Sequence, residues 1–129
     1  MANRSPKPNL SKLRQQAASE KTSSLRLQEL AKIDIELARI VAKNANAAPD
    51  LLFDLSSSSD DMIRENVASN PNTPTEILFK LAAEFPQQLL ENPVFSLLLL
   101  ENPNFILEIP LISLQALLKL DCISPQFWN

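Results

Sequence analysis

The sequence predicts an all-α protein built from short helices, and three features of its composition point to that class. The 129 residues include no glycine and ten prolines, and 45% are hydrophobic although only 5% are aromatic. β-Hairpins and sheet bulges depend on glycine for positive φ angles, whereas proline is well accommodated in the first turn of a helix. We therefore expect helices with a leucine-rich core, which prolines interrupt and restart.

The first 22 residues are expected to form a flexible basic arm. They contain Pro6, Pro8 and scattered charge, and little apolar surface beyond Leu10 and Leu13. Such a segment buries too little surface to offset the entropy of ordering it. It contains no apolar stretch of the kind that a secretory signal needs. Organellar transit peptides share this composition, but a flexible arm is the simpler interpretation.

Residues 23–129 are expected to form one helical-repeat domain. The sequence aligns with itself at steps of 25 and 26 residues, so that "VAKNAN" at Val41 recurs as "VASNPN" at Val67. Asparagine and small residues repeat along with leucine, so leucine abundance alone does not explain the period. The expected units are residues 27–51, 52–77 and 78–93, followed by a variant C-terminal part, residues 94–129.

Apolar spacing and capping residues locate the helices within these units. Apolar residues at helical intervals predict one continuous helix over residues 24–43. Ser59 or Asp60 can cap the second helix of the next unit. The stretch "NTPTE" fits a capping box, in which Thr73 is the cap, the proline is the first helical residue and Glu76 follows three residues after the cap.

The last third consists of short helical pieces that begin with proline: "PQQLLEN", "PVFSLLLLEN" and "PNFILEI". The four leucines from 97 to 100 advance about 300° around a helix, so neighbouring units or a partner must cover them on several sides. The run is far shorter than the roughly 20 apolar residues of a bilayer span, and no membrane segment is expected. Glu91 and Glu101 end two of the pieces, where the helix dipole disfavours acid.

Phe127 and Trp128 lie just before the last residue of the sequence, and two interpretations of these aromatic residues stay open. They either cap the open end of a stack of repeats or anchor a partner. The partner would be another protein, a larger complex or a second copy of the chain. The candidate protein-binding residues are Leu97, Leu98, Leu100, Phe105, Phe127 and Trp128.

The segment "VASNPNTPTEILFKLA", residues 67–82, resembles the repeat of the bacterial leucine-rich repeat variant family. The segment "VAKNANAAPDLLFDLS", residues 41–56, is a more degenerate match, and the resemblance covers about residues 25–93. The family implies a short right-handed solenoid of alternating α- and 3₁₀-helices, and a role in interaction instead of catalysis. Some relatives carry an iron–sulfur domain, which the single Cys122 cannot supply.

The residue types that usually carry catalysis or bind cofactors are missing. Histidine and glycine are absent, so the commonest general base and the phosphate-cradling loop are excluded. One cysteine excludes cysteine-type zinc and iron–sulfur sites and fits a reducing, cytoplasmic compartment. Asp60 and Asp61 are explained by the favourable position of acid at a helix N-terminus. We expect no enzyme activity, metal or cofactor.

Charge is divided unevenly along the chain. Residues 1–43 carry nine Lys or Arg and four Asp or Glu, a net charge of +5; residues 44–129 carry three and eleven, a net charge of −8. Two functions follow: a non-catalytic scaffold or accessory subunit that binds protein, and a nucleic-acid-associated protein tethered through its basic arm. The first is preferred because no aromatic residue lies among the basic ones to stack on a base. The candidate residues for an anionic partner are Arg4, Lys7, Lys12, Arg14, Lys21 and Arg26.

Overall fold

The structure is a computed structural model that describes residues 10–118, and every regular element in that range is helical. No strand occurs in this part of the chain, which confirms the predicted all-α class. The elements in order are α1 (Leu10–Ala18), α2 (Ser24–Ile33), α3 (Ile35–Lys43), α4 (Pro49–Leu55), α5 (Asp61–Ser69), α6 (Thr75–Ala82), α7 (Pro86–Glu91), α8 (Pro93–Glu101), the 3₁₀-helix η1 (Pro103–Glu108) and α9 (Leu111–Leu118).

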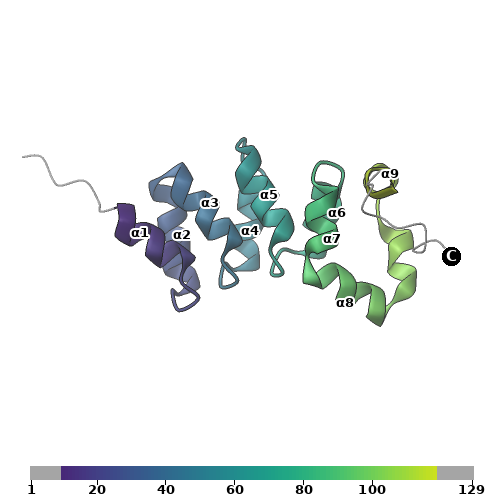
Figure 1. Ribbon diagram of the computed structural model, residues 1–129, viewed down its shortest axis with the longest axis horizontal. Coiled ribbons are helices and arrows are strands. Elements are labelled where there is room, and N and C mark those ends of the chain that lie inside the picture. The colour runs from purple at the N-terminus through teal and green to yellow at the C-terminus, as the bar shows by residue number, and fades with distance from the viewer. Residues whose placement is uncertain (1–9, 119–129) are drawn as a thin grey trace, which may run out of the picture.

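The helices follow one another along the long axis of the molecule (Figure 1). α1, α3, α5 and α7 form one layer, in which each helix packs on the next. α2, α4 and α6 pack on α3, α5 and α7 respectively. The pairs α2–α3, α4–α5 and α6–α7 therefore form three repeat-like units, and α9 packs on the last of them.

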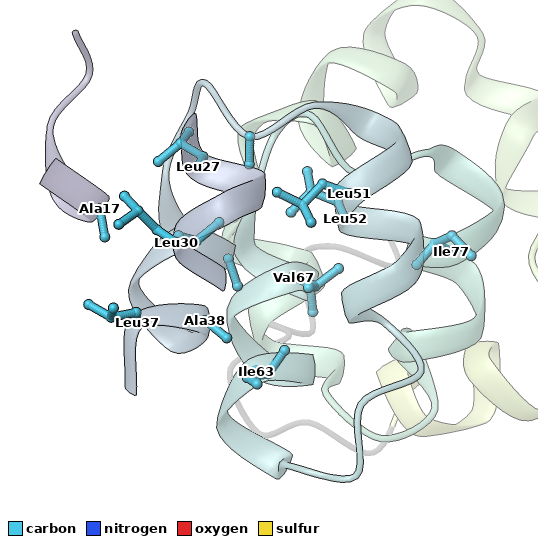
Figure 2. Packing of buried hydrophobic residues seen from close by; sticks show 14 of the residues in the cluster. Ala17, Leu27, Leu30, Leu37, Ala38, Leu51, Leu52, Ile63, Val67 and Ile77 are labelled. Carbon is cyan, nitrogen blue, oxygen red and sulfur yellow. The ribbon is translucent and has the colours of Figure 1, made fainter. Parts of the chain in front are cut away.

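An aliphatic core runs between successive helices from α1 to α6 (Figure 2). The residues that the sequence period aligned lie in the interior: Leu37, Ile63 and Leu89 are at most 3% exposed. A second cluster continues the core into the last elements, where Phe95 of α8 and Leu117 of α9 are buried together with Leu89. The period of about 26 residues thus marks the buried face of each unit.

The predicted continuous helix over residues 24–43 is wrong. Asp34 separates α2 from α3 with an extended backbone, φ −159° and ψ 149°. Its carboxylate accepts a hydrogen bond from the backbone N–H of Glu36 (3.0 Å) and so caps α3. The break folds α2 back on α3, so that Leu30 and Leu37 both become fully buried.

Capping was predicted correctly at one helix and wrongly at another. Asp60 caps α5, because its carboxylate accepts a hydrogen bond from the N–H of Ile63 (3.0 Å). Thr73 does not cap α6, which begins after Pro74 without a side-chain cap. The Thr73 hydroxyl is buried and donates to the carbonyl oxygen of Val67 (2.7 Å), so it closes the turn between α5 and α6 instead.

The predicted flexible arm, residues 1–22, is wrong from residue 10 onward. Leu10–Ala18 forms helix α1, which packs on α3. Leu13 and Ala17 lie four residues apart on one face of that helix, and they are 9% and 0% exposed in the main core. Residues 1–9 lie outside the described part of the chain.

The alternation of α- and 3₁₀-helices that the family resemblance implies is not found in residues 10–118. Each repeat-like unit pairs two α-helices, and the 3₁₀-helix η1 lies beyond them. Pro86, Pro93 and Pro103 begin α7, α8 and η1, as the sequence predicted. The unusual C-terminal pieces are therefore real helices, but they depart from the two-helix unit.

Candidate functional site

Three buried asparagines join each unit to the one before it. Asn44, Asn70 and Asn92 directly follow α3, α5 and α7 and are at most 5% exposed. The Nδ2 group of Asn70 donates to the carbonyl oxygens of Ala42 (2.8 Å) and Asn44 (2.9 Å). The corresponding acceptors are Ala17 and Ser19 for Asn44, and Ala68 and Asn70 for Asn92, at 2.8 to 3.0 Å. We call these three residues the asparagine rungs.

The rungs satisfy backbone groups that a helix leaves without partners. The last carbonyl groups of an α-helix have no intrahelical N–H to accept from, and the rungs supply that donor from the next unit. At the same time, each Oδ1 accepts a hydrogen bond from a backbone N–H two residues later, which fixes the turn. Those N–H groups belong to Asn46, Asn72 and Val94, at 2.8, 2.9 and 3.0 Å.

Two further asparagines extend this pattern toward the surface. The Nδ2 group of Asn46 donates to the carbonyl oxygens of Glu20 and Thr22, and that of Asn72 to those of Ala45 and Ala47. The sequence carried the signal, because "NAN" and "NPN" recur at the same step. Asparagine is common in turns, so its repetition alone did not predict a contact with the preceding unit.

Arginine–carboxylate pairs also link successive units. They are Arg14–Glu36, Arg39–Asp60 and Arg64–Glu84, with shortest N–O distances of 2.6, 2.7 and 2.7 Å. Each arginine uses two nitrogens on its carboxylate, which is the strong, two-pronged geometry of such pairs. The arginines recur every 25 residues and the acids every 24. This spacing was a second repeat signal that the sequence analysis missed.

The pairs shift the pKa of Asp60 and of the three arginines. Hydrogen bonding from Arg39, supported by the N–H of Ile63, lowers the pKa of the Asp60 carboxyl below its ordinary value. Hydrogen bonds to Glu36, Asp60 and Glu84 raise the pKa of Arg14, Arg39 and Arg64 respectively above the ordinary value for arginine. Both shifts favour the charged forms of Asp60 and of the three arginines.

Two of the residues predicted to bind an anionic partner are engaged within the protein. Arg14 pairs with Glu36, and Arg26 pairs with Glu29 (3.1 Å) and also donates to Gln16. Both guanidinium groups therefore already have carboxylate partners at the N-terminal end of the stack. Lys12 and Lys21 lie on the surface in and after α1. Arg4 and Lys7 lie outside the described residues.

Exposed apolar side chains concentrate on the last three elements. Leu97 and Leu100 of α8 are 56% and 81% exposed, Leu107 of η1 is 82% exposed, and Leu111 and Ile112 of α9 are 69% and 67% exposed. We call these five residues the C-terminal apolar surface. The other large apolar side chains at the surface of the described chain are spread over α1 to α5.

The structure separates the predicted protein-binding residues into three groups. Leu97 and Leu100 are exposed, whereas Leu98 is half-buried and packs with Leu99 against the second core cluster. The four leucines thus point in several directions, as their helical advance predicted. Phe127 and Trp128 lie outside the described residues, as does the side chain of Phe105.

The C-terminal apolar surface lies in an acidic part of the chain. No Lys or Arg occurs from residue 81 to 118, whereas Glu84, Glu91, Glu101 and Glu108 do. Glu84 is already paired with Arg64. Glu101 is exposed and forms no ion pair within residues 10–118. Glu101 therefore lies exposed on the same helix as the exposed Leu97 and Leu100, in a stretch of sequence without a cation.

The described part of the chain offers no metal site and no membrane span. No group of three or more Cys, Asp or Glu side chains in residues 10–118 is placed to hold a metal ion. Nor does any helix in this range combine the length and apolarity that crossing a bilayer requires. Comparisons of the chain with known protein families, with curated proteins and with solved structures find no match.

Proposed function

We propose that this protein is a non-catalytic helical-repeat scaffold, a short right-handed solenoid that binds another protein through its C-terminal apolar surface. The observation that carries the proposal is the exposure of Leu97, Leu100 and Leu107 at 56% to 82%. α8 and η1, which carry these leucines, pack on each other, and large apolar side chains left exposed on adjacent elements of a small protein mark an interaction site more often than a solvent-facing surface. The resemblance of residues 67–82 to leucine-rich repeat variants supports the same role in a bacterial cytoplasm.

The two ends of the stack support this assignment because they differ. At the N-terminal end, Leu13 and Ala17 of α1 are buried and Leu10 is 40% exposed, and only Leu25 of the adjacent α2 reaches 73%. At the C-terminal end, α8 and η1 leave large apolar side chains in contact with solvent. Repeat proteins need a polar outer face at each terminus of the stack to stay soluble alone, and a partner would cover the apolar side chains that α8 and η1 expose within the described residues.

The asparagine rungs and ion pairs also favour binding. The rungs fix each unit against the next through largely buried hydrogen bonds and the ion pairs add bonds nearer the surface, so the stack presents its surface in one arrangement. A rigid surface loses less conformational entropy when a partner docks on it. The nucleic-acid alternative has less support, because Arg14 and Arg26 already pair with carboxylates of the same chain.

Affinity purification with matched variants tests the proposal. The full chain is compared with Leu97→Ser/Leu100→Ser and with the control Leu25→Ser/Phe53→Ser, whose side chains are also more than half exposed but lie on α2 and α4. We expect the unaltered chain and the control to recover the same protein partner, and the α8 variant to lose it at an unchanged melting temperature. Equal recovery by all three chains, or no partner with the unaltered chain, would contradict the proposal.

A further inference from the structure

We propose that the partner presents a basic amphipathic helix, which docks along α8 with its apolar face on Leu97 and Leu100 and a cation on Glu101. This inference rests on the proposed function and adds the chemistry of the partner. Three observations support it. Leu97, Leu100 and Glu101 share one face of α8, the charge on that face is acidic, and this charge disfavours an anionic lipid surface or a second copy of the chain.

The exposed face of α8 has the form of a docking ridge. Leu97, Leu100 and Glu101 stand at positions i, i+3 and i+4, so their side chains share one face of the helix. Leu98 and Leu99 pack against the core cluster instead and hold α8 in place. α8 packs on η1, where Leu107 is also exposed, and both lie at the C-terminal end of the stack (Figure 1). Apolar side chains at this spacing fit the grooves of a second helix.

The charge on this face is unfavourable in the protein by itself. Glu101 is the last residue of α8, where the helix dipole places partial negative charge, so a carboxylate there is locally destabilising. The first "ENP" motif places Glu91 in the same position at the end of α7. Gln87 donates a hydrogen bond to Glu91 (3.1 Å), but neither carboxylate forms an ion pair among the described residues. A cation on the partner would satisfy both Glu101 and the carbonyl end of α8.

The acidic charge on α8 disfavours two other occupants of this face, an anionic lipid surface and a second copy of the chain. An anionic lipid surface attracts basic segments and would repel this acidic face. A symmetric dimer through α8 would place like carboxylates on the same small interface, because each residue of such an interface meets the equivalent surface of the other copy. A basic helix has neither problem, and complementary charge would also speed its association.

Fluorescence anisotropy with two synthetic peptides tests the inference on the full chain. The first is a helix of about 18 residues with leucine at i, i+3, i+4 and i+7 and lysine elsewhere. The second replaces every lysine with glutamate. We expect the lysine peptide to bind at least about tenfold more tightly than the glutamate peptide, with an affinity that falls as salt rises.

Two substitutions separate the charge from the apolar contact. Glu101→Gln should weaken the lysine peptide by about threefold to tenfold and reduce its salt dependence, and Leu100→Ser should weaken it at every salt concentration. The matched control is Asp54→Asn, because Asp54 is an exposed acid in the last turn of α4. It should leave the affinity unchanged.

Several results would overturn the inference. They are equal binding of the two peptides, an effect of Asp54→Asn as large as that of Glu101→Gln, and a dimer in sedimentation that Leu100→Ser dissociates. A severalfold gain in affinity on Phe127→Ala/Trp128→Ala would show that the end of the chain occupies α8. If a partner that depends on Leu97 and Leu100 is recovered but the lysine peptide is not preferred, this inference alone fails. Preference for the lysine peptide without such a partner would contradict the proposed function.

Discussion

At the scale of the residue, the asparagine rungs show why one side chain type recurs at one position. Asparagine has two N–H donors and an acceptor on a short side chain. Asn70 uses the donors on the carbonyl oxygens of Ala42 and Asn44, and the acceptor on the N–H of Asn72. Aspartate would keep the acceptor and lose both donors, and glutamine would be one methylene too long for the same turn. The second "ENP" shows the contrast: Asn102 keeps the turn bond to Asn104 but is exposed.

The ion pair between Arg39 and Asp60 predicts how stability changes in acid. The pKa of Asp60 is lowered in the folded state, so its contribution is present above the unfolded-state pKa and is lost as pH falls through the folded value. Between the two pKa values, Asp60 is protonated in the unfolded chain but still charged in the folded protein, so acid favours unfolding. We expect Asp60→Asn to lower the melting temperature at pH 7 and to reduce the further loss between about pH 5 and pH 2.

Circular dichroism melts at a series of pH values check this prediction. Asp54→Asn removes an exposed acid for which the structure gives no ion pair, and its melting temperature should follow that of the unaltered chain across the same range. If Asp60→Asn and the unaltered chain lose stability in parallel, the pair does not carry the effect.

At the scale of the element, α1 shows how little sequence signal a docked helix can carry. Leu13 and Ala17 are its buried residues, and two apolar positions in a polar segment do not make a convincing helical pattern. What holds α1 is contact from other units: the Asn44 side chain donates to the carbonyl oxygens of Ala17 and Ser19, and Arg14 pairs with Glu36. α1 thus stands where the second helix of a preceding unit would stand.

Matched substitutions within α1 test whether it is part of the folded stack. Leu13→Ala should lower the free energy of unfolding by about 2 kcal/mol, as expected for a buried leucine near a surface. Leu10→Ala makes the same change at a position that is 40% exposed, and it should lower that free energy by less than about 0.5 kcal/mol. Urea denaturation measures both values. Equal, small losses would mean that α1 does not pack on α3.

At the scale of the whole molecule, the sequence predicted what depends on local pattern. The absence of glycine and the recurring Leu37, Ile63 and Leu89 were sufficient for an all-α, repeat-like protein with a defined core face. The leucine run of α8 was also read correctly as facing several directions. These features are visible in the composition, in the alignment of the sequence with itself and in the helical advance of one short run.

Most of the missed features depend on partners that are distant in the sequence. Asn70 contacts residues that precede it by 26 and 28 positions, and Arg39 contacts an acid 21 positions later. The break at Asp34 is different, because its cap is a bond to Glu36 two residues later, and the apolar spacing that continues on both sides concealed this local signal. The candidate site was predicted in part because leucine density was visible, but which leucines remain exposed depends on how α8 packs.

The central claim is that buried asparagine rungs hold the units together and thereby present the C-terminal apolar surface. Asn70→Asp and Asn102→Asp test it most directly, because both keep the oxygen that fixes the turn and only the first removes bonds to a preceding unit. Thermal and urea denaturation should show a loss of about 2–4 kcal/mol for Asn70→Asp, since two buried carbonyl groups lose their donors. Asn102→Asp should cost less than about 0.5 kcal/mol. Small and equal losses in the two variants would contradict the account.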